Sequence, residues 1–325
     1  MGMDFASGGR LELHLTHSDV GKRVSVRRIT EVVGGRPLFA DAVGVLTSWN
    51  DGVLVVTRRG GETVRIVESA VVAGKIVPDA PVRRGVRPPR ATARELQELA
   101  SRGWPAAETE RLGGWSLRAA GGFTRRANSA LPLGDPGIPV SDAAGQVTRW
   151  YAARSLPPYI QVVDEDPVVA ELDRLGWTAE APTLIRTAPV QPLADLPGAE
   201  RVRLSREVDD AWLARYHRTG TLGAEAVKVL AGGPSVWFAT APGAIGRCVV
   251  DGRWALFGVI EVDPAHRRQG LGTAVMAALA RRAMEEGASG AYLQVEADNE
   301  GARSMYDRMG FTTHHAYHYR RAPKG

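Results

Sequence analysis

The chain has 325 residues, of which 44% are hydrophobic and 24% charged, with a formal net charge of +5 at pH 7. Such a chain is too long for one ordinary domain and apolar enough to bury real cores, which excludes an intrinsically disordered protein. Its single cysteine, Cys248, excludes an intramolecular disulfide framework and fits a reducing compartment.

Neither a membrane span nor a signal peptide is predicted. No apolar run reaches the roughly 20 residues that a spanning helix needs, and residues 1–10 lack an apolar core. The positive charge is compatible with nucleic acid binding but does not require it, and we do not expect nucleic acid as a partner. We expect a bacterial, cytoplasmic protein that does not bind membranes and is a monomer or a homodimer.

Short β-type runs separated by turns occupy the first quarter of the chain. They cover residues 24–29, 42–49, 53–58 and 63–67, with Asn50-Asp51-Gly52 and Gly60-Gly61 as hairpin turns. We expect a flexible N-terminus over residues 1–17 and a small SH3-like β-barrel over residues 18–80. Residues 81–90, rich in Arg and Pro, are interpreted as a solvated linker rather than a phosphate-binding patch.

Residues 91–190 alternate helical and strand patterns. Helices are expected at 92–102, 142–154 and 167–175, and strands at 115–118, 123–131, 159–163 and 183–187, with a Gly/Pro-rich loop at 132–139. The closing order of helix, Gly176, Trp177 and strand recurs near the C-terminus around Gly310 and Phe311. The repeat predicts that residues 91–190 are a degenerate copy of the domain at 198–325.

The sequence Arg267-Arg268-Gln269-Gly270-Leu271-Gly272 joins an expected strand at 254–262 to an expected helix that runs to about residue 286. Glycines let the backbone approach a ligand closely, and the unpaired N–H groups of a helix N-terminus attract an anion. Two arginines add positive charge beside them. This combination predicts a pyrophosphate-binding cradle.

A second motif follows an expected strand at 291–296. Ala302, Met305, Tyr306 and Met309 recur at helical spacing, and Gly310 ends the helix. With Arg267-x-x-Gly270-x-Gly272 upstream, the motif over 299–311 makes the chain resemble the GNAT (Gcn5-related N-acetyltransferase) superfamily. The resemblance implies an α/β fold whose mixed sheet splays between two strands to hold acetyl-CoA.

The resemblance also implies roles for individual residues. Backbone groups of the strand that precedes the cradle bind the pantetheine arm, and Tyr306 acts on the thiolate as general acid or hydrogen-bond donor. Asn299 caps its helix or bonds the pantetheine arm. The implied acetyl-CoA contacts are Ile260, Val262, Arg267, Arg268, Gln269, Gly270, Leu271, Gly272, Thr273, Asn299 and Tyr306. The stretch 121–129 is similar to inactive halves of tandem GNAT proteins.

No strong general base is evident. Leu256 and Gln294 occupy positions where many family members place Glu or His, and the nearest carboxylates are Glu261 and Glu296. We treat both as candidate catalytic residues beside a water chain. An α-amine, with a pKa near ~7.8, is far more often neutral at pH 7 than a lysine with a pKa of ~10.4. A low-pKa amine of a peptide or small molecule is therefore the favoured acceptor, ahead of an internal lysine.

His314, His315 and His318 lie on an expected last strand at 311–320 without the pairing that zinc requires, so no metal is expected. Two alternatives to the leading function stay open. One is an enzyme that uses another acyl-CoA or a special amine. The other is a module that senses acyl-CoA or docks a partner without turnover.

Overall fold

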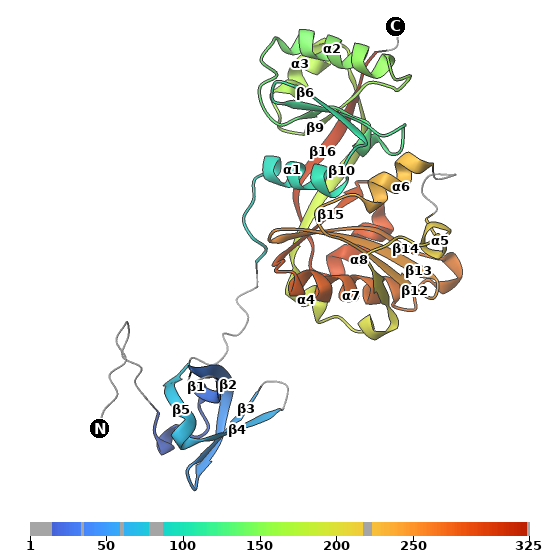
Figure 1. Ribbon diagram of the computed structural model, residues 1–325. Helices are drawn as coiled ribbons and strands as arrows, with labels where there is room; N and C mark the ends of the chain where they lie inside the picture. Colours follow the sequence, from blue (N-terminus) through green and yellow to red (C-terminus); the bar gives the residue numbers. More distant parts are fainter. Residues whose placement is uncertain (1–14, 34–35, 59–61, 78–86, 217–222, 324–325) are drawn as a thin grey trace. The chain divides into compact units, whose positions relative to one another are not determined.

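The computed structural model describes residues 15–33, 36–58, 62–77, 87–216 and 223–323, in two units, Met1–Gly85 and Val86–Gly325 (Figure 1). Most of the expected flexible N-terminus and of the Arg/Pro linker, and the Gly60-Gly61 turn, lie outside these residues. Within them, no helix combines the length and the apolar content that crossing a bilayer demands.

The N-terminal unit is a five-stranded antiparallel sheet in the order β4-β3-β2-β1-β5. Its elements are η1 (His17–Asp19), β1 (Arg23–Val33), β2 (Arg36–Asn50), β3 (Val53–Thr57), β4 (Thr63–Val67), η2 (Glu68–Ala70) and β5 (Val71–Ile76). Val24, Leu46, Trp49 and Leu54 lie in its core. Among the described residues the edge strands β4 and β5 do not pair with each other, so the sheet is open and an SH3-like barrel remains a prediction.

The larger unit begins with the elements that we call the first half. They are α1 (Ala93–Gly103), β6 (Glu108–Leu112), β7 (Trp115–Ala119), η3 (Arg125–Ala127), β8 (Leu131–Pro132), α2 (Val140–Ala152), β9 (Tyr159–Val163), α3 (Val168–Arg174) and β10 (Thr178–Pro189). Short helices α4 (Val190–Ala194) and η4 (Ala199–Arg201) connect it to the second half. The capping box of Thr92 and Glu95 fixes the start of α1.

The second half consists of β11 (Arg203–Ser205), α5 (Asp210–Leu213), α6 (Ala224–Ala231), β12 (Val236–Ala241), β13 (Ala244–Asp251), β14 (Trp254–Val262), η5 (Pro264–His266), α7 (Leu271–Glu285), β15 (Gly290–Glu296), α8 (Glu300–Arg308) and β16 (Thr312–Arg321). The expected strands and helices around both motifs are present here within a few residues of their predicted bounds.

The strand expected at 123–131 is wrong. Thr124 has a φ of 57°, and the Asn128 side chain takes up the backbone groups that a ladder would use. Asn128 accepts from the N–H groups of Ala120 and Gly122 and donates to the carbonyls of Phe123 and Thr124. An asparagine that bonds its own loop in this way stabilises a turn instead of a strand.

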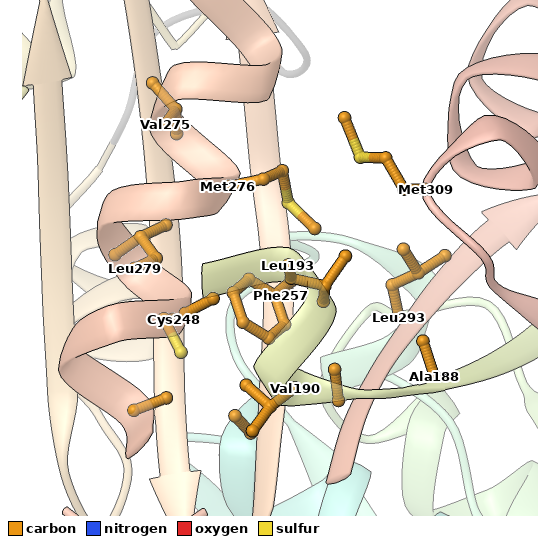
Figure 2. Packing of buried hydrophobic residues seen from close by; sticks show 14 of the residues in the cluster. Ala188, Val190, Leu193, Cys248, Phe257, Val275, Met276, Leu279, Leu293 and Met309 are labelled. Atoms are coloured by element: carbon orange, nitrogen blue, oxygen red, sulfur yellow. The ribbon is translucent and has the colours of Figure 1, made fainter. Parts of the chain in front are cut away.

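Strands from both halves alternate in one sheet. Its order is β11-β12-β13-β14-β15-β10-β16-β9, so β10 of the first half lies between β15 and β16 of the second. β14 and β15 are parallel, whereas β10 is antiparallel to both of its neighbours. Helix α7 covers one face, where Val275, Met276 and Leu279 pack in a cluster with Phe257 and Leu293 (Figure 2). The first half thus contributes a central strand to the sheet of the second.

Arg186 of β10 attaches the end of α8 to the sheet. Its guanidinium is buried and donates to Asp307 Oδ1 at 2.5 Å, to the Phe311 carbonyl at 2.5 Å and to the Arg303 carbonyl at 3.2 Å. These acceptors lie on α8 and just beyond its end, so one side chain bonds this region at three points. A side chain of the first half therefore fixes the helix that carries Tyr306.

We expect Arg186→Met to lower the free energy of unfolding by about 2 kcal/mol, because it leaves the buried Phe311 carbonyl without its donor. The exposed Arg308 on the same helix is the matched control, and Arg308→Met should change stability by less than about 0.5 kcal/mol. Urea unfolding of the three proteins measures both values. Equal effects of the two substitutions would contradict an anchoring role for Arg186.

Candidate functional site

The sheet opens between β14 and β15. These strands pair from Trp254 with Gly290 to Phe257 with Leu293, and no pairing continues beyond that point. A cavity of about 520 Å³ lies there. It is lined by Trp104, Thr124, Arg125, Arg126, Ala181, Thr183, Tyr216, Arg247, Leu256, Phe257, Gly258, Val259, Gln294, Val295, Glu296, Asn299, Tyr317 and Tyr319.

A β-bulge in β14 borders this opening. Val259 and Ile260 face the single residue Gly246 of β13, because the register shifts between the pairs Ile245–Glu261 and Arg247–Gly258. Val259 has a φ of 54°, a strained conformation for a β-branched residue, and such strain concentrates at functional sites. A Cβ on Gly246 would lie 2.4 Å from Val275 Cγ1, so glycine lets α7 pack closely behind the bulge.

The expected cradle is the N-terminus of α7. Gly270 is its N-cap, with a φ of 75°, and the Ala274 N–H is the one that bonds the Gly270 carbonyl. The N–H groups of Leu271, Gly272 and Thr273 precede that bond and lack intrahelical acceptors. Arg267 and Arg268 are exposed beside them. These groups fit an anion of the pyrophosphate type.

The second motif forms the neighbouring helix α8. Asn299 is its N-cap and accepts from the Ala302 N–H at 3.1 Å, while also lining the cavity. A Cβ on Gly272 would lie 3.4 Å from Met305 Sδ and 3.7 Å from Val262 Cγ2. The cradle, the end of β14 and α8 therefore meet at one place.

The expected proton-transfer residues separate into two groups. Glu296 lines the cavity, and Glu261 and Tyr306 do not. Tyr306 is buried, with its ring centroid 5.7 Å from that of Phe311 in an edge contact. Gln294 lines the cavity but accepts the Tyr317 hydroxyl at 2.6 Å. Glu296 is thus the carboxylate with direct access to the cavity among the described residues.

The three C-terminal histidines form separate contacts. His314 Nδ1 lies 2.9 Å from His315 Nδ1, and His315 Nε2 lies 2.9 Å from Gln97 Nε2. Burial, assisted by His314, lowers the pKa of His315 to about 4, which keeps it neutral at pH 7. His318 contacts Asp164 at 2.7 Å. No group of three potential metal ligands occurs among the described residues.

Residues of the first half were missed as site residues. Trp104, Thr124, Arg125 and Arg126 all line the cavity, three of them from the stretch 121–129. From the sequence, residues 121–129 show only a resemblance to inactive halves of tandem GNAT proteins, and a strand is predicted at 123–131. Its paired arginines next to glycines were the available signal for a functional loop.

Comparisons with known proteins agree with this geometry. A family model described as "Probable histone acetyltransferase Rv0428c C-terminal" matches residues 90–320. The curated "Probable histone acetyltransferase Rv0428c" of Mycobacterium tuberculosis is 30% identical over 307 residues, which are 92% of this chain and 94% of the relative. The "Uncharacterized N-acetyltransferase YobR" of Bacillus subtilis is 25% identical over 247 residues, 70% of this chain and 97% of the relative.

The chain belongs to this acetyltransferase family. The fold agrees with the assignment, since a GCN5-related N-acetyltransferase from Kribbella flavida superposes with a TM-score of 0.54 at 17% identity, covering 73% of this chain and 98% of that one. The protein is therefore a GNAT-type N-acetyltransferase, with acetyl-CoA as its implied cosubstrate.

The two cradle glycines of the acetyltransferase should respond differently to alanine. Gly270→Ala forces a Cβ into left-handed backbone and should cost about 1 kcal/mol of stability. Gly272 is helical, and its added Cβ would meet the flexible Met305 side chain at an ordinary distance, so Gly272→Ala should cost less than about 0.5 kcal/mol. Urea unfolding without ligand measures both, and equal costs would contradict the cap geometry.

Proposed function

We propose that this acetyltransferase transfers the acetyl group of acetyl-CoA to a primary amine of low pKa, above all an α-amine of a peptide or small molecule, in a ternary complex. The observation that carries the proposal is the cavity at the β14–β15 opening. Among the residues that the structure describes, three arginines and one carboxylate line it, and the α7 cradle adjoins the same opening.

Acetyl-CoA supplies the thioester, whose carbonyl carbon gains the C–N bond as the C–S bond breaks. The N–H groups at the start of α7 bind its pyrophosphate, with Arg267 and Arg268 alongside. Backbone groups of the bulge around Ile260 and of Val262 orient the pantetheine arm and the acetyl carbonyl. One preorganised N–H at that carbonyl is worth about 3 kcal/mol in the transition state.

Two residues handle protons in this proposal. Glu296, directly or through water, accepts the proton that the amine loses, and Tyr306 donates a hydrogen bond toward the departing thiolate. Transfer of the tyrosine proton to a free thiolate is uphill, since a phenol has a pKa of ~10 and a thiol ~8.5. The role assigned to Tyr306 is therefore stabilisation of charge rather than complete protonation.

The charge of the cavity supports the choice of amine. Arg125, Arg126 and Arg247 disfavour a bound ammonium ion and so lower the pKa of an amine beside them. At pH 7 about one lysine in 2,500 is neutral, against more than a tenth of α-amines. An acceptor whose amine is already neutral does not need a strong general base. This suits a site that has Leu256 and Gln294 where a base could stand.

The name of the M. tuberculosis relative points to a second candidate, a histone-type lysine. A peptide with one free α-amine and no lysine can be compared with an N-blocked peptide that carries one lysine. At pH 7 we expect kcat/KM to favour the α-amine by about a few hundredfold, the ratio of the two neutral fractions. Between pH 7 and 9 the lysine rate should rise about tenfold per unit, while the α-amine rate levels off. A lysine peptide that is the better substrate at pH 7 would assign this enzyme to the histone-type class.

Tyr306→Phe should lower kcat by about tenfold or more while acetyl-CoA binding, measured by calorimetry at one site per chain, stays within about twofold. The reason is that the hydroxyl acts on charge that develops during the reaction, whereas the ring contact with Phe311 is kept. Phe311→Leu is a control for packing alone. Equal kcat in the Tyr306→Phe and wild-type enzymes would remove Tyr306 from the mechanism.

A further inference from the structure

The cavity has more positive than negative side chains. Arg125, Arg126 and Arg247 line it, and Glu296 is the carboxylate among its described lining residues. Transfer of an acetyl group to an amine does not itself require positive charge on the acceptor side. The presence of three arginines therefore needs an explanation. The three differ in how many of their donors already have partners within the protein.

The guanidinium of Arg247 is engaged in hydrogen bonds to backbone carbonyls. It is buried and donates to the carbonyls of Leu230 at 2.6 Å, Gly103 at 2.9 Å and Gly232 at 2.6 Å. Arg125 is about half exposed, and its guanidinium lies 3.7 Å from Glu180. Neither arginine therefore offers the cavity a full set of donors.

Arg126 differs from both. Its Nε is buried and has no hydrogen-bond partner among the described residues, and no described carboxylate pairs with it. Its guanidinium lies 5.2 Å from the centre of the Trp104 ring. Tyr317, which also contacts it, donates its own proton to Gln294 and offers only a neutral oxygen. The side chain as a whole is half-buried, and a buried guanidinium N–H without an acceptor is costly unless a ligand supplies one.

The loop that presents Arg126 is held in place from both sides. The Asn128 side chain bonds the backbone from Ala120 to Thr124, and Trp104 Nε1 donates to Thr124 Oγ1 at 3.0 Å. Thr124 keeps a φ of 57° within it, and such strained positions persist only where surrounding contacts hold them. The first half therefore presents a preorganised cation to the cavity of the second.

We propose that the acceptor of this enzyme carries a carboxylate near its amine and that Arg126 binds this carboxylate. The inference rests on the proposed function and adds the substrate class, namely acidic amines such as peptides with Glu or Asp at the first two positions. A planar guanidinium matches a carboxylate in a charge-assisted pair. Arg126 is then a specificity residue that the first half supplies.

The test uses peptide pairs of equal length with amidated C-termini, which differ only as Glu against Gln at the first or the second position. Each pair keeps the α-amine and changes one charge. Wild-type enzyme should acetylate the Glu member of at least one pair with a kcat/KM about tenfold or more above its Gln partner. Arg126→Gln should bring this ratio close to one, and Arg126→Lys should retain part of it.

Arg149→Gln is the matched control. It removes the same charge from an exposed position on α2 of the first half, outside the cavity lining, and should preserve the wild-type ratio. No preference for the Glu members in the wild type, or a preference that survives Arg126→Gln, overturns the proposal. If the Gln variant does not fold, Arg126→Lys replaces it: a ratio below the wild-type value supports the proposal, and a ratio equal to the wild-type value overturns it.

A second readout separates this proposal from the proposed function. Calorimetric titration of the N-acetylated Glu and Gln peptides in the presence of CoA measures recognition without turnover. Preference for the acidic product in wild type and its loss in Arg126→Gln support the anion site even if no peptide is acetylated. Acetylation of both members of each pair, with equal binding of both products, rejects the anion site and leaves the acetyltransferase proposal standing.

Discussion

The structure depends on the point where parallel pairing between β14 and β15 stops. Four pairs, from Trp254–Gly290 to Phe257–Leu293, hold the strands together, and the chain then diverges. The bulge at Val259 and Ile260 turns β14 away, and α7 packs against the sheet through Gly246. The cavity, the N-terminus of α7 and the Asn299 cap all border this one opening, so its geometry sets their relative positions.

The first half maintains that opening from the other side. β10 pairs with β15 through seven residues, from Thr183 with Glu296 to Pro189 with Gly290, and so supports the strand that has lost its parallel partner. Arg186 of the same strand attaches α8. The first half therefore supplies a strand, an anchor and part of the cavity wall to the second half.

Sequence reasoning succeeded where function imposes its own pattern. The start of a helix favours particular residue types, such as glycine or asparagine at the N-cap. The structure has Gly270 as the N-cap of α7, Gly272 in its first turn and Asn299 as the N-cap of α8, at the positions that the motifs predict. The predictions were wrong or missing where the hydrogen bonds of one side chain, or contacts between residues distant in the sequence, determine the structure. The turn around Asn128 needs a side chain that bonds its own loop, and the insertion of β10 pairs residues more than a hundred positions apart, which no local periodicity reveals.

A positive cavity and a weak base can be parts of one solution to the same chemical problem. An enzyme that acetylates an amine must obtain it unprotonated, either by removing a proton with a strong base or by making the ammonium form unfavourable. Leu256 and Gln294 exclude the first route at their positions, whereas the charge of Arg247 favours the electrostatic second. The Nε of Arg126 is buried without a hydrogen-bond partner among the described residues, and an acidic acceptor would supply an anionic partner on binding. On this view Arg247 acts on the amine, and Arg126 recognises the carboxylate of the acceptor.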